Sequence, residues 1–193
     1  GDWSSDVCSS DLLHSWAISN CGLILVKSLL DCMLGTSDNK AATEAGWDGR
    51  SIRISYNRYK GLPEVLLGLL KMDSSIPAQT NLVFPALEFA RRVGPPEKDR
   101  AQFREEFYNS VIKHLNCPIW IFRDLAARTA STFLLEDNWK APIIELLESK
   151  SFSTNGLHGI FLLIRYLIEK RLDLDRSLTK GMIISSHIAH SSY

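Results

Sequence analysis

The segment RSIRISYNRYK, at residues 50–60, combines the residue types that bind single-stranded RNA. Its cations and aromatic residues are interleaved: Arg50, Arg53, Tyr56, Arg58, Tyr59 and Lys60. Cations contact phosphates and release counterions, while aromatic rings stack on the unpaired bases of a loop. The segment also contains no acidic residue. We therefore take these six residues as candidate RNA contacts. The alternative is a solvated loop whose tyrosines anchor it to the next helix.

No comparable pattern in the sequence indicates catalysis. The sequence contains no glycine-rich nucleotide-binding motif, no nucleophile elbow and no zinc-protease motif. His187 and His190 have no acidic or thiol partner nearby in the sequence, so a solvated tail is favoured over a metal site. His114 and Cys117 flank a predicted helix end, where capping explains them, and His158 fits a hydrogen-bonded core histidine. We expect no catalytic residue, no cofactor and no metal, and hence no enzyme.

Composition places the chain among ordinary globular proteins. Of its 193 residues, 45% are hydrophobic and 23% are charged, and the formal net charge is zero. The four cysteines form no C-x-x-C pair, which is typical of a reducing compartment. The apolar run GIFLLI ends at Arg165, well short of the roughly 20 residues that a membrane-spanning helix needs. These features fit a cytosolic or nuclear protein without a membrane partner, and of the two we expect a cytoplasmic location.

Apolar residues recur at helical spacing along most of the chain. This periodicity predicts helices over 15–35, 61–72, 80–96, 96–116, 118–135, 141–150 and 155–172. Only IRIS, at residues 52–55, alternates as a short strand would. The fold class is therefore all-α, with short helices in antiparallel succession as either a bundle or a solenoid of helix pairs.

A sequence pattern that occurs twice in the chain favours the solenoid over the bundle. The segments SWAISNCG (15–22) and IWIFRDLA (119–126) superpose, with Trp16 aligned on Trp120. In the second copy Arg123 follows three residues after the tryptophan, and two alanines come next. This pattern resembles the inner helix of a HEAT repeat, in which the tryptophan covers the neighbouring repeat and the arginine reaches along the stack. We expect an α-solenoid of HEAT/armadillo-like helix pairs, with Trp16, Trp120 and Arg123 as repeat-packing residues.

Five ordered blocks carry a family resemblance across residues 14–172. They are SWAISNCGLILVKSLLDCMLG, YNRYKGLPEVLLGLL, NLVFPALEFARRVGPPE, HLNCPIWIFRDLAARTASTFL and NGLHGIFLLIRYLIE. In this order they resemble the thyroid-adenoma-associated (THADA) family. That resemblance implies a long helical-repeat scaffold that regulates tRNA methylation. It further implies a separate 2′-O-methyltransferase subunit that carries the chemistry, and a 2′-hydroxyl in the tRNA anticodon loop as its target.

The resemblance also suggests how the chain is divided. The opening DWSSDVCSSDL looks like the translation of a sequencing-library adapter, so we expect residues 1–12 to be an artefact that supports no function. Residues 13–172 are then the helical-repeat region, an internal fragment of a longer array, and residues 173–193 are an unassigned tail. Two functions follow from these patterns: a scaffold for tRNA 2′-O-methylation, or a generic HEAT-type protein-interaction adaptor without a role in RNA.

Overall fold

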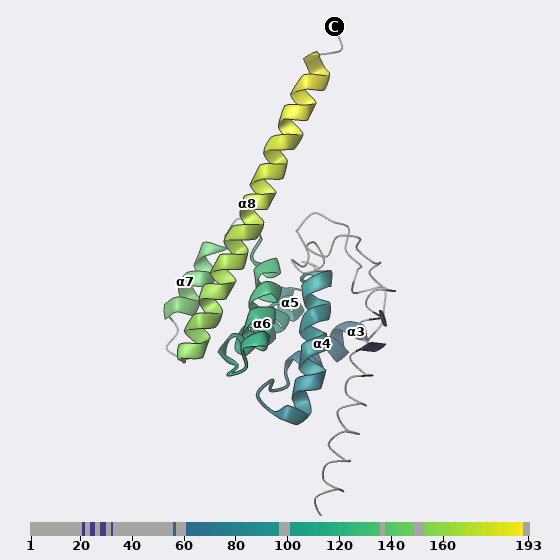
Figure 1. The fold of residues 1–193 in the computed structure, drawn as a ribbon, viewed down its shortest axis with the longest axis vertical. Helices are drawn as coiled ribbons and strands as arrows, with labels where there is room; N and C mark the ends of the chain where they lie inside the picture. The colour runs from purple at the N-terminus through teal and green to yellow at the C-terminus, as the bar shows by residue number, and fades with distance from the viewer. Residues whose placement is uncertain are drawn as a thin grey trace, which may run out of the picture.

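The computed structural model of the chain describes residues 21, 24, 25, 28, 29, 32, 56, 61–96, 101–135, 138–148 and 153–190. Of these, residues 77, 78, 174 and 177–190 are described by their backbone alone. All regular elements within these ranges are helices, which confirms the all-α prediction (Figure 1). Of the helix predicted over 15–35, the six described positions are helical. The predicted strand at 52–55 lies outside the described residues.

The helices form three antiparallel pairs. The first pair is α3 (Leu62–Leu70) and α4 (Pro77–Val93). The second is α5 (Ala101–Ile112), which continues through the 3₁₀ helix η3 (Lys113–Asn116), and α6 (Trp120–Phe133). The third is α7 (Lys140–Glu148) and α8 (Thr154–His190).

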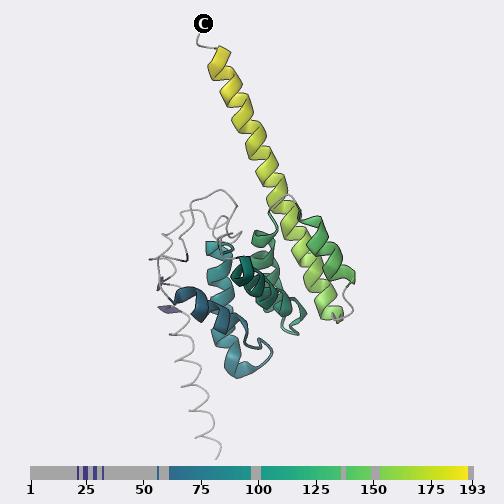
Figure 2. The same ribbon diagram turned by 180° about the vertical axis from the view of Figure 1, so that it is seen from behind.

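The pairs stack side by side in two layers. Helix α6 packs between α4 and α8, and these three form one layer (Figure 1). The helices α3, α5 and α7 each pack on the second helix of their own pair and lie on the other side, as the view from behind shows (Figure 2). Stacked helix pairs are the arrangement of an α-solenoid. The assignment of these pairs to the HEAT/armadillo class stays a prediction.

Helix boundaries follow local signals in the sequence. Gly61 and Gly94 adopt φ angles of 81° and 82°, which a side chain would disfavour, and they lie next to the start of α3 and the end of α4. Pro63 and Pro77 occupy first-turn positions of their helices, where the missing N–H has no intrahelical role. The observed helices therefore begin and end within a few residues of their predicted bounds.

Helix α8 is the exception, because it extends to His190 and not to residue 172. Beyond the body of the fold it projects as a single helix (Figure 1). No proline interrupts residues 154–190, so each added residue extends an existing ladder without a new nucleation step. Among the described residues, no helix is long and apolar enough to cross a membrane.

The core is centred on α6, in which eleven of the fourteen residues are buried. Ala126, Ala127 and Ala130 are fully buried, and their small side chains let the neighbouring helices approach closely. At the base of α8 the approach is closer still, because a Cβ atom on Gly159 would lie 2.3 Å from the Leu115 carbonyl oxygen. A residue larger than glycine cannot occupy this contact without displacing η3 or α8.

Candidate functional site

The structure places one of the six candidate RNA contacts, Tyr56, in the core. Its side chain is 2% exposed, and its hydroxyl donates a hydrogen bond to the Gly94 carbonyl oxygen at 2.9 Å. Its ring meets the Phe107 ring edge-on, with centroids 6.0 Å apart. A ring held in this way cannot stack on a base, so the expectation for Tyr56 is corrected. Tyr56 is an anchoring residue, as in the alternative, but the contacts described here are with Gly94 after α4 and Phe107 on α5 and not with the next helix. The other candidates, Arg50, Arg53, Arg58, Tyr59 and Lys60, lie outside the described residues.

Of the repeat-packing residues, Trp120 and Arg123 are described and Trp16 is not. Trp120 begins α6 and is 54% exposed, so within the described part of the chain most of its ring is uncovered. Arg123 is buried one turn further along. Its Nη1 donates to the carbonyl oxygens of Cys117 at 2.7 Å and Pro118 at 2.8 Å, which fixes the turn that leads into α6.

Arg123 also reaches the neighbouring helix pair. Its Nε donates to Nδ1 of His158 on α8 at 3.3 Å. His158 is exposed, which corrects its expected position in the core, although the expected hydrogen bond is present. The guanidinium of Arg123 thus connects the start of α6 with the first turns of α8.

A second polar connection between α6 and α8 lies two turns further along α8. Asp124, almost fully buried, accepts a hydrogen bond from the Tyr166 hydroxyl at 2.5 Å and another from Arg128 Nε at 2.9 Å. The Arg128 guanidinium also lies 4.6 Å from the centroid of the Tyr166 ring. Burial, together with the carboxylate of Asp124, raises the pKa of Tyr166, so the hydroxyl remains a donor at neutral pH.

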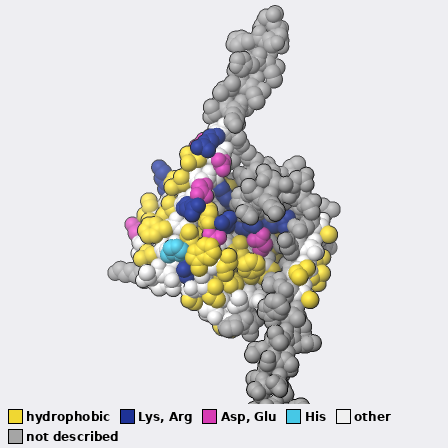
Figure 3. Space-filling model, viewed as in Figure 1, with side chains coloured by type: hydrophobic (Ala, Val, Ile, Leu, Met, Phe, Trp, Pro, Cys, Tyr) yellow, Lys and Arg dark blue, Asp and Glu magenta, His cyan; other side chains and the backbone are white. Residues whose placement is uncertain are grey.

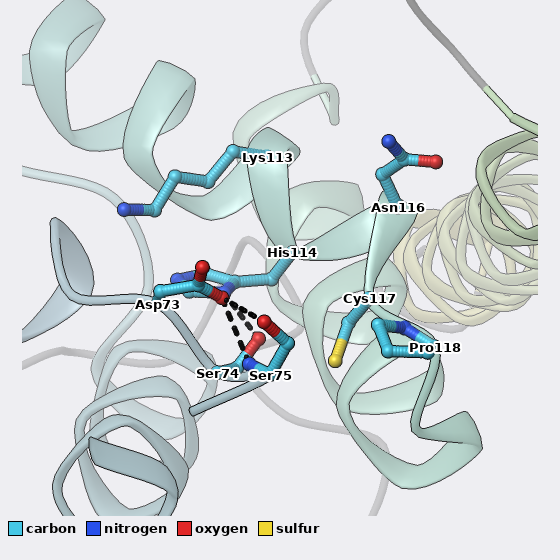
Figure 4. A pocket seen from close by; sticks show the side chains of 8 residues that line it. All are labelled: Asp73, Ser74, Ser75, Lys113, His114, Asn116, Cys117 and Pro118. Carbon is cyan, nitrogen blue, oxygen red and sulfur yellow. Dashed lines mark hydrogen bonds between the residues drawn. The ribbon is translucent and has the colours of Figure 1, made fainter. Parts of the chain in front are cut away.

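A cavity with polar, ionisable and apolar side chains lies between the loop that joins α3 to α4 and the loop that leads into α6. It encloses about 350 Å³. Figure 4 shows its lining side chains: Asp73, Ser74, Ser75, Lys113, His114, Asn116, Cys117 and Pro118. A serine, a histidine and an aspartate in one cavity raise the possibility of a catalytic triad, which the hydrogen bonds can test.

The hydrogen bonds of His114 are those of a structural residue. Its Nε2 lies 2.8 Å from the Leu70 carbonyl oxygen, which can only accept, so Nε2 carries the proton. Its Nδ1 then accepts from the Ser74 hydroxyl at 2.9 Å. Burial lowers the pKa of His114 to about 4, so the ring is neutral at pH 7. Both nitrogens are occupied in connecting the end of α3, the following loop and η3.

Asp73 does not complete a triad. Its Oδ1 accepts hydrogen bonds from the backbone N–H of Ser75 at 2.8 Å and from the Ser75 hydroxyl at 2.7 Å. These hydrogen bonds hold the pKa of Asp73 below its usual value. Ser74 is only 2% exposed, so its hydroxyl is closed to a substrate. The arrangement therefore positions backbone elements and presents no activated nucleophile.

The prediction that His114 caps a helix is confirmed, but the helix that it caps is not the one that was predicted. The imidazole caps the last turn of α3, which lies 44 residues earlier, and not the helix end beside it. Nothing local in the sequence indicates that partner, because the contact exists only once the helix pairs stack. Among the described residues, no group of three or more His, Cys, Asp or Glu side chains could hold a metal ion.

Comparison with known families gives one match. The family model for Trm732, C-terminal TPR repeats, matches residues 19–167, which is well over half of the chain. No curated protein and no solved structure matches the chain. The matched range contains the three stacked helix pairs as far as Leu167 of α8, including both connections between α6 and α8.

Proposed function

Because this chain belongs to the family of Trm732 C-terminal TPR repeats, the THADA family of tRNA methyltransferase regulators, we propose that it is a non-catalytic scaffold for tRNA 2′-O-methylation. In this role it binds a partner methyltransferase, which carries the S-adenosylmethionine chemistry, and directs that enzyme to a ribose in the tRNA anticodon loop. The family match carries the proposal. The chain would act in the cytoplasm.

Buried polar side chains bind other parts of the same chain, which supports a scaffold role. His114, Ser74 and Asp124, the buried groups most capable of acid–base chemistry, each bind another part of the chain. Such pairings make the stack of helix pairs rigid, which suits a protein that positions a partner. They do not leave a nucleophile beside a base, as catalysis by the chain itself would require.

The basic segment at 50–60 is the part of the chain that we assign to tRNA. Arg50, Arg53, Arg58 and Lys60 supply phosphate contacts, and Tyr59 supplies a stacking surface. Tyr56 has the different role of attaching this segment to the core through Gly94. The assignment therefore rests on five residues, with Tyr56 as their anchor.

The test is to disrupt the gene that encodes this chain and to measure ribose methylation in the anticodon loop of total tRNA. Loss of a 2′-O-methyl group, restored by the intact gene, is the expected result. Affinity purification of the tagged protein should recover a methyltransferase together with tRNA. Unchanged methylation, with recovery of protein partners alone, would favour the adaptor function.

A further inference from the structure

A second cavity lies between the outer helices α5 and α7, which are the first helices of neighbouring pairs. It encloses about 340 Å³, near the lower limit of the roughly 300–1,000 Å³ that ligand pockets occupy. Its walls include Glu105 and Tyr108 of α5, Phe133 and Leu134 at the end of α6, and Pro142 of α7. Because it lies between two pairs, a further helix pair at either end of the stack would not fill it.

The hydroxyl of Tyr108 is buried without a hydrogen-bond partner in the part of the chain that the structure describes. Burial, together with the carboxylate of Glu145, raises the pKa of Tyr108, so this hydroxyl stays protonated. The two other tyrosines that the structure describes, Tyr56 and Tyr166, each donate to an oxygen of the chain. Burying a hydroxyl without a hydrogen bond lowers stability, and the ring of Tyr108 borders a cavity with room for a bound group.

The walls of the cavity suit the stem of a long side chain. The rings of Tyr108 and Phe133 lie with their centroids 5.6 Å apart, and Pro142 adds aliphatic surface opposite α5. The Arg104 guanidinium is held beside this wall, because it donates to the Pro96 carbonyl oxygen at 2.9 Å and lies 5.9 Å from the centroid of the Phe133 ring. An alkyl chain that enters the cavity therefore meets aromatic and aliphatic surface.

Two carboxylates give the cavity an excess of negative charge. Glu105 lines it, and Glu145 lies close enough to Tyr108 to act on its pKa. Neither forms an ion pair with a residue that the structure describes. Against these two carboxylates the lining contributes one cation, Arg104. The cavity is therefore electrostatically complementary to a positive group.

The layer formed by α4, α6 and α8 shows the opposite arrangement. On this face, basic and acidic side chains adjoin one another (Figure 3). Asp124 pairs with Arg128, and Glu169 pairs with Arg165, each at 2.9 Å. Carboxylates of this layer are thus matched from within their own helices, whereas those beside the cavity are not.

We propose that the cavity between α5 and α7 binds a basic side chain, an arginine or a lysine, of a partner protein. The stem of this side chain lies against Phe133 and Pro142. Its charged head faces Glu105 and Glu145 and donates to the hydroxyl oxygen of Tyr108. Basic side chains carry only donors, and a tyrosine hydroxyl can accept as well as donate, so the unpaired hydroxyl gains the partner that it lacks.

A protein partner fits this cavity better than a free small molecule. Ala101 and Glu105 are exposed, so the cavity opens to solvent along α5. A small ligand is held by a pocket that encloses most of its surface, whereas a side chain is also held by the protein surface that carries it and covers the opening. This binding does not depend on the role in tRNA methylation.

The first experiment titrates the complete 193-residue chain, with isotope-labelled tyrosine and phenylalanine, against three probes observed by NMR. The probes are the N-acetyl methylamides of arginine, norleucine and glutamate. The arginine probe should shift the ring signals of Tyr108 and Phe133 with millimolar affinity, the norleucine probe should bind about tenfold more weakly, and the glutamate probe should not bind. Equal binding of arginine and norleucine, or no binding of arginine, would overturn the proposal.

The second experiment removes the charges one at a time. Glu105→Gln and Glu145→Gln should each weaken binding of the arginine probe about threefold and leave the norleucine probe unaffected. Both side chains are exposed, so neither change should disturb the fold. The matched control is Glu106→Gln, at the next position of α5, where the carboxylate pairs with Lys71 outside the cavity. Equal weakening by Glu106→Gln would contradict a specific site.

The third experiment tests the hydroxyl through Tyr108→Phe. Binding of the arginine probe, followed by the Phe133 ring signal, should weaken about fivefold. The urea midpoint should not fall, because the hydroxyl has no hydrogen bond to lose. Tyr56→Phe, which removes a hydroxyl bonded to Gly94, is the matched control and should lower the midpoint. If Tyr108→Phe lowered it equally, the hydroxyl would have a partner inside the folded chain and the proposal would be wrong.

Discussion

The Tyr166 hydroxyl on α8 donates a hydrogen bond to the buried carboxylate of Asp124 on α6, with 2.5 Å between the two oxygens. The same carboxylate accepts from Arg128, one turn further along α6. The aspartate is therefore held from two sides, once within its own helix and once across the boundary between helix pairs. This contact helps to fix how the second and third pairs are placed. A hydrogen bond to a carboxylate requires a particular direction, whereas the surrounding apolar contacts do not.

The first prediction concerns this contact. Tyr166→Phe removes the donor and leaves Arg128, so we expect a loss of about 2 kcal/mol in the free energy of unfolding, measured by urea titration. Asp124→Ala should cost more, about 3 kcal/mol, because it removes both hydrogen bonds of the buried carboxylate. As the matched control, Glu169→Gln breaks the exposed pair with Arg165 and should have no measurable effect. Equal effects of the three changes would show that Asp124 has no special role.

The second prediction compares two glycines. Gly159→Ala places a Cβ atom 2.3 Å from the Leu115 carbonyl oxygen, so it should destabilise the chain by about 3 kcal/mol or more. Gly68→Ala, in the middle of α3 with open space around its Cα, should stabilise it by up to about 1 kcal/mol. Thermal unfolding of the two variants beside the wild type measures both signs. A neutral Gly159→Ala would mean that η3 and α8 separate easily.

The sequence predicts those parts of the fold that depend on residues close together in the chain, and it does not predict those that depend on residues far apart in the chain. Gly61, Gly94 and Pro63 act on their own neighbours, so the ends of α3 and α4 were predictable from local sequence. Tyr56 and Gly94 are 38 residues apart, and their hydrogen bond depends on how complete helices stack. The aromatic and cationic composition of residues 50–60 therefore suggested a role in RNA binding for a tyrosine that the core holds.

The same reasoning applies to His114 and to α8. The partners of His114, Ser74 and Leu70, lie 40 and 44 residues away, and no periodicity indicates them. For α8, the apolar periodicity predicted a helix over 155–172, whereas the observed helix continues to His190. Extending a helix that has already formed needs no further apolar face, so the helix did not stop where the apolar pattern stopped.

The third prediction is a pH dependence set by His114. In the unfolded chain a histidine titrates near pH 6.5, whereas burial lowers the pKa of folded His114 to about 4. Between these values the unfolded state binds a proton that the folded state does not, so stability must fall as the pH falls from about 6.5 to about 4. The full loss is about 3 kcal/mol, and above pH 7 this residue contributes no slope.

Urea titrations at pH 7.5, 5.5 and 4.5 measure this slope. The control is His114→Gln, whose amide can still donate to the Leu70 carbonyl but does not titrate. This variant should be less stable at pH 7.5 and should lose most of the slope between pH 6.5 and 4. If the slope persisted unchanged in the variant, His114 would not be its source.

The fourth prediction separates the two kinds of residue in the 50–60 segment. Arg53→Glu combined with Arg58→Glu should weaken binding of an unmodified tRNA by about tenfold or more, and binding should depend less steeply on salt, because fewer counterions are released. Tyr56→Phe should leave tRNA affinity unchanged but reduce the free energy of unfolding by about 1 kcal/mol, since it removes the bond to Gly94. Arg165→Glu combined with Arg176→Glu, a double charge reversal on exposed parts of α8, controls for net charge. Fluorescence anisotropy over a series of salt concentrations distinguishes these outcomes, and equal weakening by both charge reversals would remove the tRNA role from residues 50–60.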